Sequence, residues 1–329
     1  MNRIWNDRAS KGDNRIEKKP LVILTGPTAV GKTDLSLRLA EAVNGELISA
    51  DSMQVYRYMD IGTAKIMPEE RRGIKHYLID VLDPKEDFNV VIFQTMAKAA
   101  MEEIYAKGKL PIVVGGTGFY IQALLYDITF EDTAVSTYRQ ELTDYCNEYG
   151  AHALHEKLKE IDPASYQEIH ENNVKRVIRA LEFYHDTGYP ISRHNEEQRQ
   201  KESPYRFSYF VLNHDRRILY QRIEDRIDLM IQNGLVEEVR KLLDYGCTKD
   251  MVSMQGLGYK EIIPCLERTC SLEDSVYTLK RDTRHFAKRQ LTWFRREKDV
   301  TWLDKQAFST EEEILQAIVK ELQEKQILL

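Results

Sequence analysis

A complete phosphate-binding loop of the form G-x-x-x-x-G-K-[ST] occupies residues 26–33, with the sequence GPTAVGKT. An apolar run rich in β-branched residues, 21–24, precedes it, and Leu35, Leu39 and Val43 follow at helical spacing. Strand, glycine loop and helix are the context in which this motif binds an oligophosphate, because backbone amides and the positive helix end point at the anion. The motif therefore predicts a parallel α/β sheet at this end of the chain.

Two side chains of the loop have expected roles. Lys32 reaches the outer phosphate in such loops, and the hydroxyl of Thr33 holds a magnesium ion. A chance match on a turn is the alternative, and the flanking strand and helix disfavour it. The motif indicates that an oligophosphate binds, but not what happens to it.

The composition is that of an ordinary globular protein. The 329 residues carry a net charge of −6, and no apolar run approaches the roughly 18 residues of a membrane span. We expect about two domains, no membrane association and a cytoplasmic location, with residues 1–19 as a mobile leader that has no secretory signal. The net charge argues against a generic nucleic-acid binder, although a basic surface near the C-terminus could still bind one.

Strand and helix patterns alternate in the first part of the chain, which predicts an α/β fold: a P-loop-type parallel sheet core with helices on both faces. We expect this core over 20–130, a helical insertion domain over 131–202, and completion of the core by 203–329. The predicted strands are 46–50, 76–80, 110–114 and 205–212, and the predicted helices are 91–107, 215–232, 235–245 and 275–296. Ligands gather beyond the carboxyl ends of such strands, so the segments that follow the strands should converge.

Asp51 follows a predicted strand and has two interpretations. Its carboxylate can accept a proton from a substrate or hold metal-bound water. It can equally cap the next helix, a frequent role for Asp in this position. The neighbouring Ser52, Gln54 and Tyr56 are polar groups that could recognise a planar base, which favours the first interpretation.

A glycine-rich loop, Gly115-Gly116-Thr117-Gly118, follows another predicted strand. Three glycines in four residues let a backbone approach a ligand closely, although an ordinary turn has the same composition. The strand before this loop carries no acidic residue, whereas P-loop NTPases usually place a metal-holding Asp there. This weakens the NTPase interpretation, although Asp80 could substitute.

Two segments are candidates for nucleic-acid contact. Lys175, Arg176 and Arg179 share one side of a predicted helix, either as a solvated face or as a contact to phosphates. The predicted helix from 277 to 298 is strongly basic and includes Arg284 and Lys288, with aromatic residues interleaved. Cations hold phosphates and aromatics can stack on unpaired bases, but the same aromatics could instead face a protein core.

Arg222 and Arg226 stand four residues apart on one predicted helix and so share a face. Either of them, or both, could clamp a phosphate in bidentate fashion. The spacing does not choose between them.

Taken together, these segments resemble the bacterial tRNA dimethylallyltransferases, also called tRNA isopentenyltransferases or the IPP transferase family. The matching segments occur in the family's order: GPTAVGKT at 26–33, ISADSMQVY at 48–56, MDIGTAK at 59–65, VGGTGFY at 114–120, RVIRALE at 176–182, QGLGYK at 255–260 and AKRQLTWFR at 287–295. The chain departs from the family pattern at Lys175, where the family often has Gln.

The resemblance implies transfer of a dimethylallyl group from dimethylallyl diphosphate to N6 of adenosine 37 in tRNA, with release of diphosphate. It implies Mg²⁺ as cofactor, the tRNA anticodon stem-loop as partner, and a monomer. The implied catalytic residues are Asp51, Thr117 and Lys32. The implied diphosphate-binding residues are Gly26, Pro27, Thr28, Ala29, Val30, Gly31, Lys32, Thr33, Arg222 and Arg226, with Thr33 as the metal ligand. The implied tRNA-binding residues are Asp51, Ser52, Met53, Gln54, Thr117, Arg139, Lys175, Arg176, Val177, Ile178, Arg179, Arg284 and Lys288.

Two other functions share parts of this pattern. A P-loop nucleotide or metabolite kinase would have the same loop, but the missing acid and the large basic insertion disfavour it. An NTP-gated RNA-binding module without prenyl chemistry is the third possibility.

Overall fold

The computed structural model describes residues 18–130 and 137–328; the predicted leader, except its last two residues, and residues 131–136 lie outside these ranges. Contacts divide the chain into two units. The first combines residues 1–125 with 204–329, and the second is the single stretch 126–203. We call them the core unit and the helical unit. In the described ranges, no helix is both long and apolar enough to cross a bilayer.

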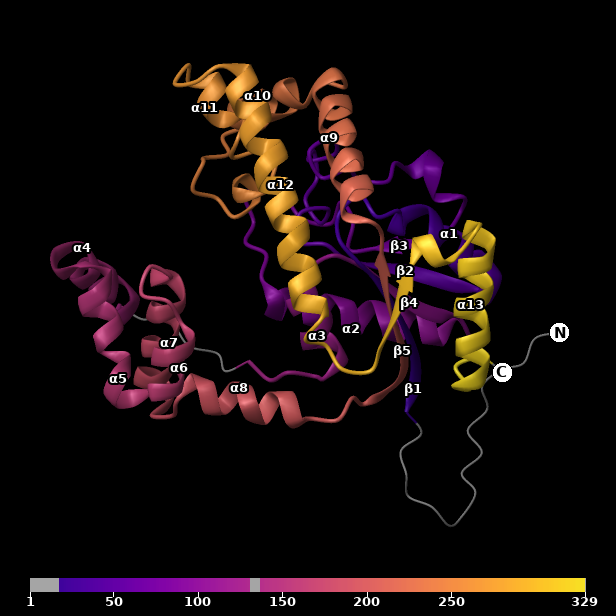
Figure 1. Ribbon diagram of the computed structural model, residues 1–329, viewed down its shortest axis with the longest axis horizontal. Helices are drawn as coiled ribbons and strands as arrows, with labels where there is room; N and C mark the ends of the chain where they lie inside the picture. The colour runs from indigo at the N-terminus through magenta and orange to yellow at the C-terminus, as the bar shows by residue number, and fades with distance from the viewer. Residues whose placement is uncertain (1–17, 131–136, 329) are drawn as a thin grey trace, which may run out of the picture. The chain divides into compact units, whose positions relative to one another are not determined.

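The core unit is built on a six-stranded sheet with the order β3-β2-β4-β1-β5-β6 (Figure 1). The strands are β1 (Lys19–Thr25), β2 (Gly45–Ala50), β3 (His76–Tyr77), β4 (Leu110–Gly115), β5 (Tyr205–Asn213) and β6 (Val300–Asp304). Every pairing is parallel. The apolar part of β1 is fully buried, because a central parallel strand is covered on both faces. The predicted parallel α/β sheet is therefore confirmed.

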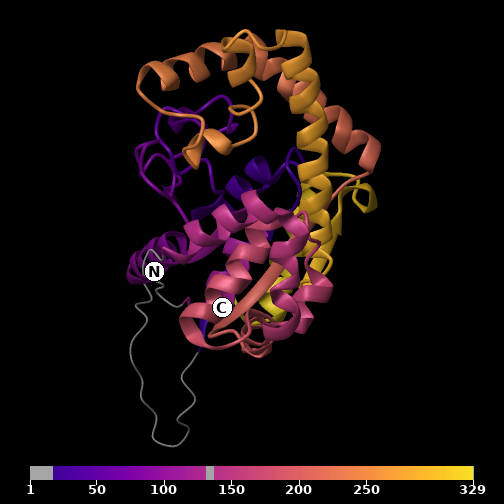
Figure 2. The ribbon, with the colours of Figure 1, turned by 90° about the vertical axis from the view of Figure 1, so that its left-hand side faces the viewer.

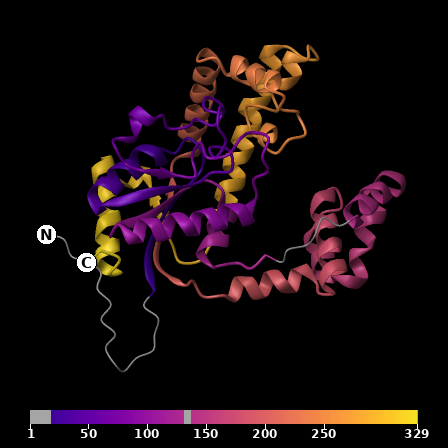
Figure 3. The ribbon, with the colours of Figure 1, turned by 180° about the vertical axis from the view of Figure 1, so that it is seen from behind.

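Helices of the core unit cover both faces of the sheet. The helices described in this unit are α1 (Lys32–Val43), α2 (Val90–Ala106), α3 (Gly118–Leu125), α9 (Arg216–Gln232), α10 (Leu235–Asp244), α11 (Ile263–Leu266), α12 (Leu272–Phe294) and α13 (Glu311–Glu324), with short 3₁₀ turns at Pro68–Arg71, Ser253–Gln255 and Lys305–Ala307; α10 and α11 stand away from the sheet (Figure 1). The β1–α1–β2 and β3–α2–β4 connections run in opposite directions across the sheet, so right-handed crossovers place α1 and α2 on opposite faces. Figure 3 shows α2 crossing the strands from behind, and α13 packs beside α1 in Figure 1.

Two long helices of the core unit, α9 and α12, pack along each other (Figures 1 and 2). An Asp215 side chain caps the start of α9, and Ser271 caps the start of α12, each by accepting backbone N–H groups of the first turn. Because α9 follows β5 directly, its first turns lie beyond the carboxyl end of that strand. The pair therefore brings cationic side chains to the edge of the sheet where ligands gather.

The strand predicted over 76–80 is shorter than expected, because only His76 and Tyr77 belong to β3. Leu78 and Asp80 both have positive φ angles, which no strand accommodates. The carboxylate of Asp80 instead accepts a hydrogen bond of 2.5 Å from Lys65. At the other end of the sheet, Lys19 belongs to β1 rather than to the predicted leader.

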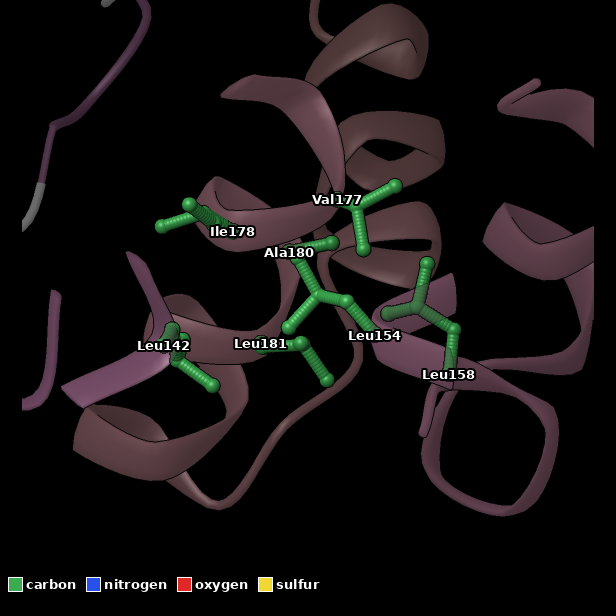
Figure 4. Close-up of a cluster of buried hydrophobic side chains, with 7 residues drawn as sticks. All are labelled: Leu142, Leu154, Leu158, Val177, Ile178, Ala180 and Leu181. Carbon is green, nitrogen blue, oxygen red and sulfur yellow. The ribbon is translucent and has the colours of Figure 1, made fainter. Parts of the chain in front are cut away.

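Over the described residues 126–130 and 137–203, the helices of the helical unit are α4 (Tyr138–Glu156), α5 (Leu158–Ile161), α6 (Pro163–Glu168), α7 (Val174–Thr187) and α8 (Ile191–Gln200). Its centre is a small cluster of buried side chains from α4, α5 and α7, namely Leu142, Leu154, Leu158, Val177, Ile178, Ala180 and Leu181 (Figure 4). The buried carboxylate of Asp162 fixes the α6 and α8 segments by accepting hydrogen bonds from Ser165 and Ser192. Hydrogen bonding to Ser192 and Ser165 holds the pKa of Asp162 below its usual value, although burial opposes this.

Candidate active site

The phosphate-binding loop connects β1 to α1, as the motif predicts. Gly31 immediately precedes the helix with a φ of 98°, a conformation that favours glycine. At Gly26, where φ is 147°, an added Cβ would lie 2.5 Å from the carbonyl oxygen of Leu212 in β5. Both glycines of the motif are thus required by the backbone path, and the loop packs against the neighbouring strand.

Lys32 folds back over its own loop. Its ammonium donates hydrogen bonds to the carbonyl oxygens of Gly26 at 2.9 Å and Pro27 at 2.8 Å. Burial and the nearby charge of Arg226 lower the pKa of Lys32 to about 7, and the charge of Asp51 acts in the opposite direction. The three predicted site residues are therefore close enough to influence one another electrostatically.

Arg222 and Arg226 influence different titratable groups. Arg226 acts on Lys32, as its effect on that pKa shows. Arg222 acts on His214, whose pKa is lowered by burial first and then by the charges of Arg222 and Lys305. Lys305 in turn donates a hydrogen bond of 3.3 Å to the carbonyl oxygen of Val30. Arg226 is therefore the arginine that acts on a residue of the loop itself, and which of the two clamps a phosphate stays open.

Asp51 lies directly beyond β2 and uses one oxygen to organise its own turn. Its Oδ1 atom accepts the backbone N–H groups of Met53 at 2.8 Å and Gln54 at 3.3 Å. Among the described residues, Oδ2 has no hydrogen-bond partner. The capping interpretation thus describes one oxygen, while the other remains available to accept a proton.

The segment that follows Asp51 is held by side-chain contacts. The Gln54 amide donates to the carbonyl oxygen of Thr63 at 3.2 Å, and its oxygen lies 3.4 Å from the hydroxyl of Ser49. An added Cβ at Gly256 would lie 2.6 Å from the sulfur of Met53, so the 255–260 segment packs closely on this turn. Gln54 was predicted to recognise a base, but here its amide fixes the loop.

Thr117 lies beside Asp51, because its backbone N–H donates to the carbonyl oxygen of Ala50 at 3.2 Å. The glycines around it have a cause that the sequence did not suggest. An added Cβ at Gly116 would overlap the amide of Gln290, and one at Gly118 would overlap the ring of Trp293. Both side chains come from α12. The glycine loop is therefore explained by the close approach of a helix.

Gln290 is a residue of this site that sequence analysis missed. It is buried in α12, accepts the backbone N–H of Thr28 at 2.9 Å, and donates to the carbonyl oxygen of Gly116 at 2.9 Å. One signal could have found it: Gln290 follows Ala287 by three residues and precedes Phe294 by four, and both of these are buried. An amide on the apolar side of a helix must find partners inside the protein.

Sequence analysis also missed Glu238 in α10, an acidic residue that holds the backbone of residues 60–62. Its carboxylate accepts the successive backbone N–H groups of Asp60, Ile61 and Gly62 at 2.7–3.0 Å, and the hydroxyl of Tyr259 at 2.8 Å. Burial raises the pKa of Tyr259 well above its usual value, with the charge of Glu238 adding to the effect. A cavity of about 510 Å³ opens beside this contact, but none of the predicted site residues lines it.

The basic helix α12 shows both patterns that the sequence left open. Phe294 is fully buried and belongs to the protein core, whereas the half-buried Trp293 packs edge-on against the exposed Phe119 with ring centroids 6.2 Å apart. Arg284 is paired with Glu224 at 2.6 Å, whereas Lys288 is exposed. That Arg284 and Lys288 contact tRNA stays a prediction. For Arg284, such a contact would have to replace the ion pair with Glu224.

In the helical unit, the predicted tRNA-binding residues separate into two groups. Lys175 and Arg176 are exposed, and Arg179 is partly exposed. Val177 and Ile178 instead have buried side chains in the hydrophobic cluster of Figure 4, so a contact with tRNA at these two positions stays a prediction that the side-chain packing does not favour. Their spacing places the neighbouring cations on the opposite side of α7.

Arg139, another predicted tRNA contact, is paired within the helical unit. Its guanidinium donates two hydrogen bonds to Glu182, at 2.7 and 2.5 Å. These bonds raise the pKa of Arg139 above its usual value. The pair fastens α4 to α7, while the arginine itself remains largely exposed.

Comparison with known proteins decides the family. The family model described as IPP transferase matches residues 54–297. The chain belongs to this family. The tRNA dimethylallyltransferase of Lachnoclostridium phytofermentans is 60% identical over 311 residues, which cover 94% of this chain and 99% of that protein. The corresponding protein of Acetivibrio thermocellus is 51% identical and covers 90% of this chain and 95% of its own.

Solved structures agree with this family membership. The full-length tRNA isopentenylpyrophosphate transferase from Bacillus halodurans superposes with a TM-score of 0.70 at 45% identity, covering 94% of this chain and 98% of its own. A eukaryotic dimethylallyltransferase, described as acting on tRNA, gives a TM-score of 0.75 at 32% identity and covers 87% of this chain and 74% of its own. The resemblance predicted from the sequence motifs is confirmed, and the kinase alternative is set aside for this IPP transferase family member.

Proposed function

We propose that this IPP transferase moves the dimethylallyl group of dimethylallyl diphosphate onto N6 of adenosine 37 in tRNA. One observation supports this most directly. The carboxyl ends of β1, β2 and β4 bring together the phosphate-binding loop with Lys32, the free oxygen of Asp51, and Thr117. A leaving-group site and a proton acceptor at one edge are what an alkyl transfer to an amine requires.

The reaction forms one bond and breaks another. N6 of adenine is a weak nucleophile, because its lone pair is delocalised into the ring. As it attacks the allylic carbon, the bond between that carbon and the diphosphate oxygen breaks, and Oδ2 of Asp51 accepts the N6 proton. The diphosphate leaves as an anion that the loop amides, Lys32, Arg222 and Arg226 stabilise. Thr117 lies beside Asp51, where it can position the acceptor base.

Magnesium fits the residues present, in a limited way. Thr33 lies in the first turn of α1 with an exposed side chain, and its hydroxyl can be one ligand. Within residues 18–130 and 137–328, no group of three or more His, Cys, Asp or Glu side chains could hold a metal by itself. Mg²⁺ commonly takes few protein ligands and completes its shell with water and phosphate oxygens. When bound, it would shield the negative charge of the diphosphate.

The acceptor is proposed to be the anticodon stem-loop of tRNA. Its target adenine must leave the base stack to reach Asp51. The exposed cations Lys175, Arg176 and Lys288 are proposed to hold phosphates, because such contacts need accessible positive charge.

We further propose that the protein acts as a monomer in the cytoplasm, which light scattering and cell fractionation would test.

The deciding experiment measures the transfer itself. Unmodified tRNA is incubated with dimethylallyl diphosphate labelled in its allylic carbon, and in parallel with ATP labelled in its γ-phosphate. We expect the carbon label in tRNA, and mass spectrometry should place it on adenosine 37. A tRNA whose adenosine 37 is replaced by guanosine is the matched control and should stay unlabelled. Phosphate transfer from ATP without carbon label in tRNA would refute the proposal.

A further inference from the structure

We propose that Gln290 is a positioning residue that sets the distance between the diphosphate loop and the acceptor loop during transfer. This inference rests on the proposed function and adds a residue that the motifs did not assign. The starting observation is a bridge: Oε1 of Gln290 accepts the Thr28 N–H, and Nε2 donates to the Gly116 carbonyl oxygen, each at 2.9 Å.

The two hydrogen bonds of Gln290 reach two different loops, one beside the diphosphate site and one beside the proton acceptor. Thr28 is part of the loop that holds the leaving diphosphate. Gly116 immediately precedes Thr117, whose N–H is bonded to Ala50, the residue before Asp51. Hydrogen bonds and the Gly116–Thr117 peptide group therefore connect the diphosphate loop, through one carboxamide, to the carbonyl of the residue that precedes the proton acceptor. Apart from this amide, only the hydroxyl of Thr25, which donates to Gly115 at 2.6 Å, joins the same two strand ends by a side chain within the described residues.

The surrounding packing gives the carboxamide little freedom. Gln290 is 6% exposed, and the neighbouring positions of α12, Ala287 and Phe294, are fully buried. Gly116 has no side chain because a Cβ there would overlap the Gln290 amide. A shift of α12 would therefore move both loops together. Displacements of about 1 Å in reacting groups are enough to slow catalysis roughly 10²-fold.

The chemistry of the bridge requires a group that accepts at one atom and donates at the other. A carboxamide does this at every pH, and a protonated carboxylic acid does so with nearly the same shape. A carboxylate cannot, since it has no proton to donate and would face the Gly116 carbonyl oxygen with a second acceptor. This difference between a carboxamide and a carboxylate separates the positioning role from a general packing role, because packing alone does not depend on the protonation of the side chain.

The experiment compares Gln290→Met and Gln290→Glu with the wild type in single-turnover transfer to tRNA. Gln290→Met keeps the size but loses both bonds, so we expect the transfer rate to fall roughly 10²-fold, with tRNA affinity within a factor of two. The activity of Gln290→Glu, relative to wild type at each pH, should rise as the pH falls from about 8.5 to about 5.5, because protonation restores the donor. The relative activity of Gln290→Met should not depend on pH. Gln323→Met, an exposed glutamine of α13, is the matched control.

Two results would overturn the inference: transfer by Gln290→Met within twofold of a competent wild type, or identical pH profiles for the Met and Glu variants. A wild type that transfers no label would refute the proposed function instead. In that case, titration with inorganic diphosphate decides the inference separately. A several-fold weaker affinity in Gln290→Met supports the positioning role, and an unchanged affinity rejects it.

Discussion

The core unit and the helical unit fix their functional side chains in different ways. In the core unit, strands distant in sequence bring Lys32, Asp51 and Thr117 together, and Lys32 bonds to carbonyl oxygens rather than to a carboxylate. In the helical unit, one short stretch of chain surrounds a small apolar cluster, and Arg139 is neutralised by Glu182. Lys32 is thus not paired with a carboxylate and can meet an anionic ligand, whereas Arg139 also stabilises the helical unit.

This difference leads to a general expectation. Substitutions in the core site should change the rate of transfer with little effect on tRNA affinity. Substitutions in the helical unit should change tRNA affinity and local stability while the diphosphate site remains intact. Substitutions in the two units test this division, and the largest effect is expected at Asp51.

Replacement of Asp51 should have the largest effect. Asp51→Asn keeps an oxygen that can cap the turn at Met53 and Gln54 but cannot accept the N6 proton. We expect the single-turnover rate to fall by about 10²–10⁴-fold, with tRNA affinity unchanged. Asp51→Ala also loses the cap and should be no more active. An Asn variant with near-normal turnover would show that the carboxylate acts only on the turn.

Truncation of Leu154 tests the independence of the helical unit. This side chain is fully buried in the cluster of Figure 4, so Leu154→Ala should destabilise the unit by about 2–5 kcal/mol. Hydrogen exchange should accelerate in α4, α5 and α7, and KM for tRNA should rise, while inorganic diphosphate binds as before. Leu229→Ala, at an exposed leucine of α9, is the control. Equal acceleration of exchange in the core sheet would contradict the division.

Neutralising Glu238 should loosen the loop that continues from Asp51 and Gln54. Glu238→Gln has one acceptor oxygen where the carboxylate had two, so its bonds to the 60–62 backbone and Tyr259 cannot all persist. We expect a loss of about 1.5–3 kcal/mol in the free energy of unfolding, followed by chemical denaturation. The adjacent Glu237→Gln removes only an exposed pair with Arg240. Similar losses in both variants would argue against the special role of Glu238.

Diphosphate binding should take up a proton. Because Lys32 has a pKa of about 7 in this structure, it is mostly neutral at about pH 8. An anion beside it raises that pKa, so the bound state holds the proton that the free state lacks. Affinity for inorganic diphosphate should therefore fall by up to about tenfold per unit above pH 7. Calorimetry in buffers of different ionisation enthalpy measures the uptake, and Lys32→Met should abolish it. Heats that do not depend on the buffer would contradict the prediction.

The exposed cations of α7 should have the smallest effect. Removing Lys175 and Arg176 together should reduce the magnitude of the slope of log affinity against log salt by about 0.7–0.9 per lost phosphate contact. The rate of dimethylallyl transfer within the enzyme–tRNA complex should not change. Filter binding over a salt series measures this slope. Lys320→Gln, an exposed lysine of α13, is the control. A lower transfer rate at saturating tRNA would mean that these residues take part in catalysis, and it would contradict the expected division between the two units.

The sequence predicted most of the fold because its main strands and helices carry strong periodic patterns. The apolar runs that became β1, β2, β4 and β5 are central strands, where burial on both faces leaves little ambiguity. The prediction failed at 76–80, where Leu78 and Asp80 turn into a loop that Lys65 holds through Asp80. An ion pair between the buried Lys65 and the exposed Asp80 has no periodic signature in the sequence.

The site was predicted where a single segment carries the chemistry, as in the phosphate-binding loop and at Asp51. It was missed where the function of a residue depends on a partner far along the chain. Gln290 contacts Thr28, and Glu238 contacts the 60–62 backbone, through packing that only the tertiary structure defines. For Val177 and Ile178, a motif treated five successive residues as one contact, although five residues span more than one helical turn, so some of them face the protein interior.

The position of the helical unit between α3 and β5 has a consequence for synthesis of the chain. β1 is translated before the helical unit, but its neighbour β5, paired with it from Lys19 to Thr25, is translated only after the whole helical unit. Until then one edge of β1 is open, and open strand edges invite wrong pairing. The helical unit, with its local contacts, can fold during this interval. The nascent chain therefore needs protection longest at the strand from which the phosphate-binding loop extends.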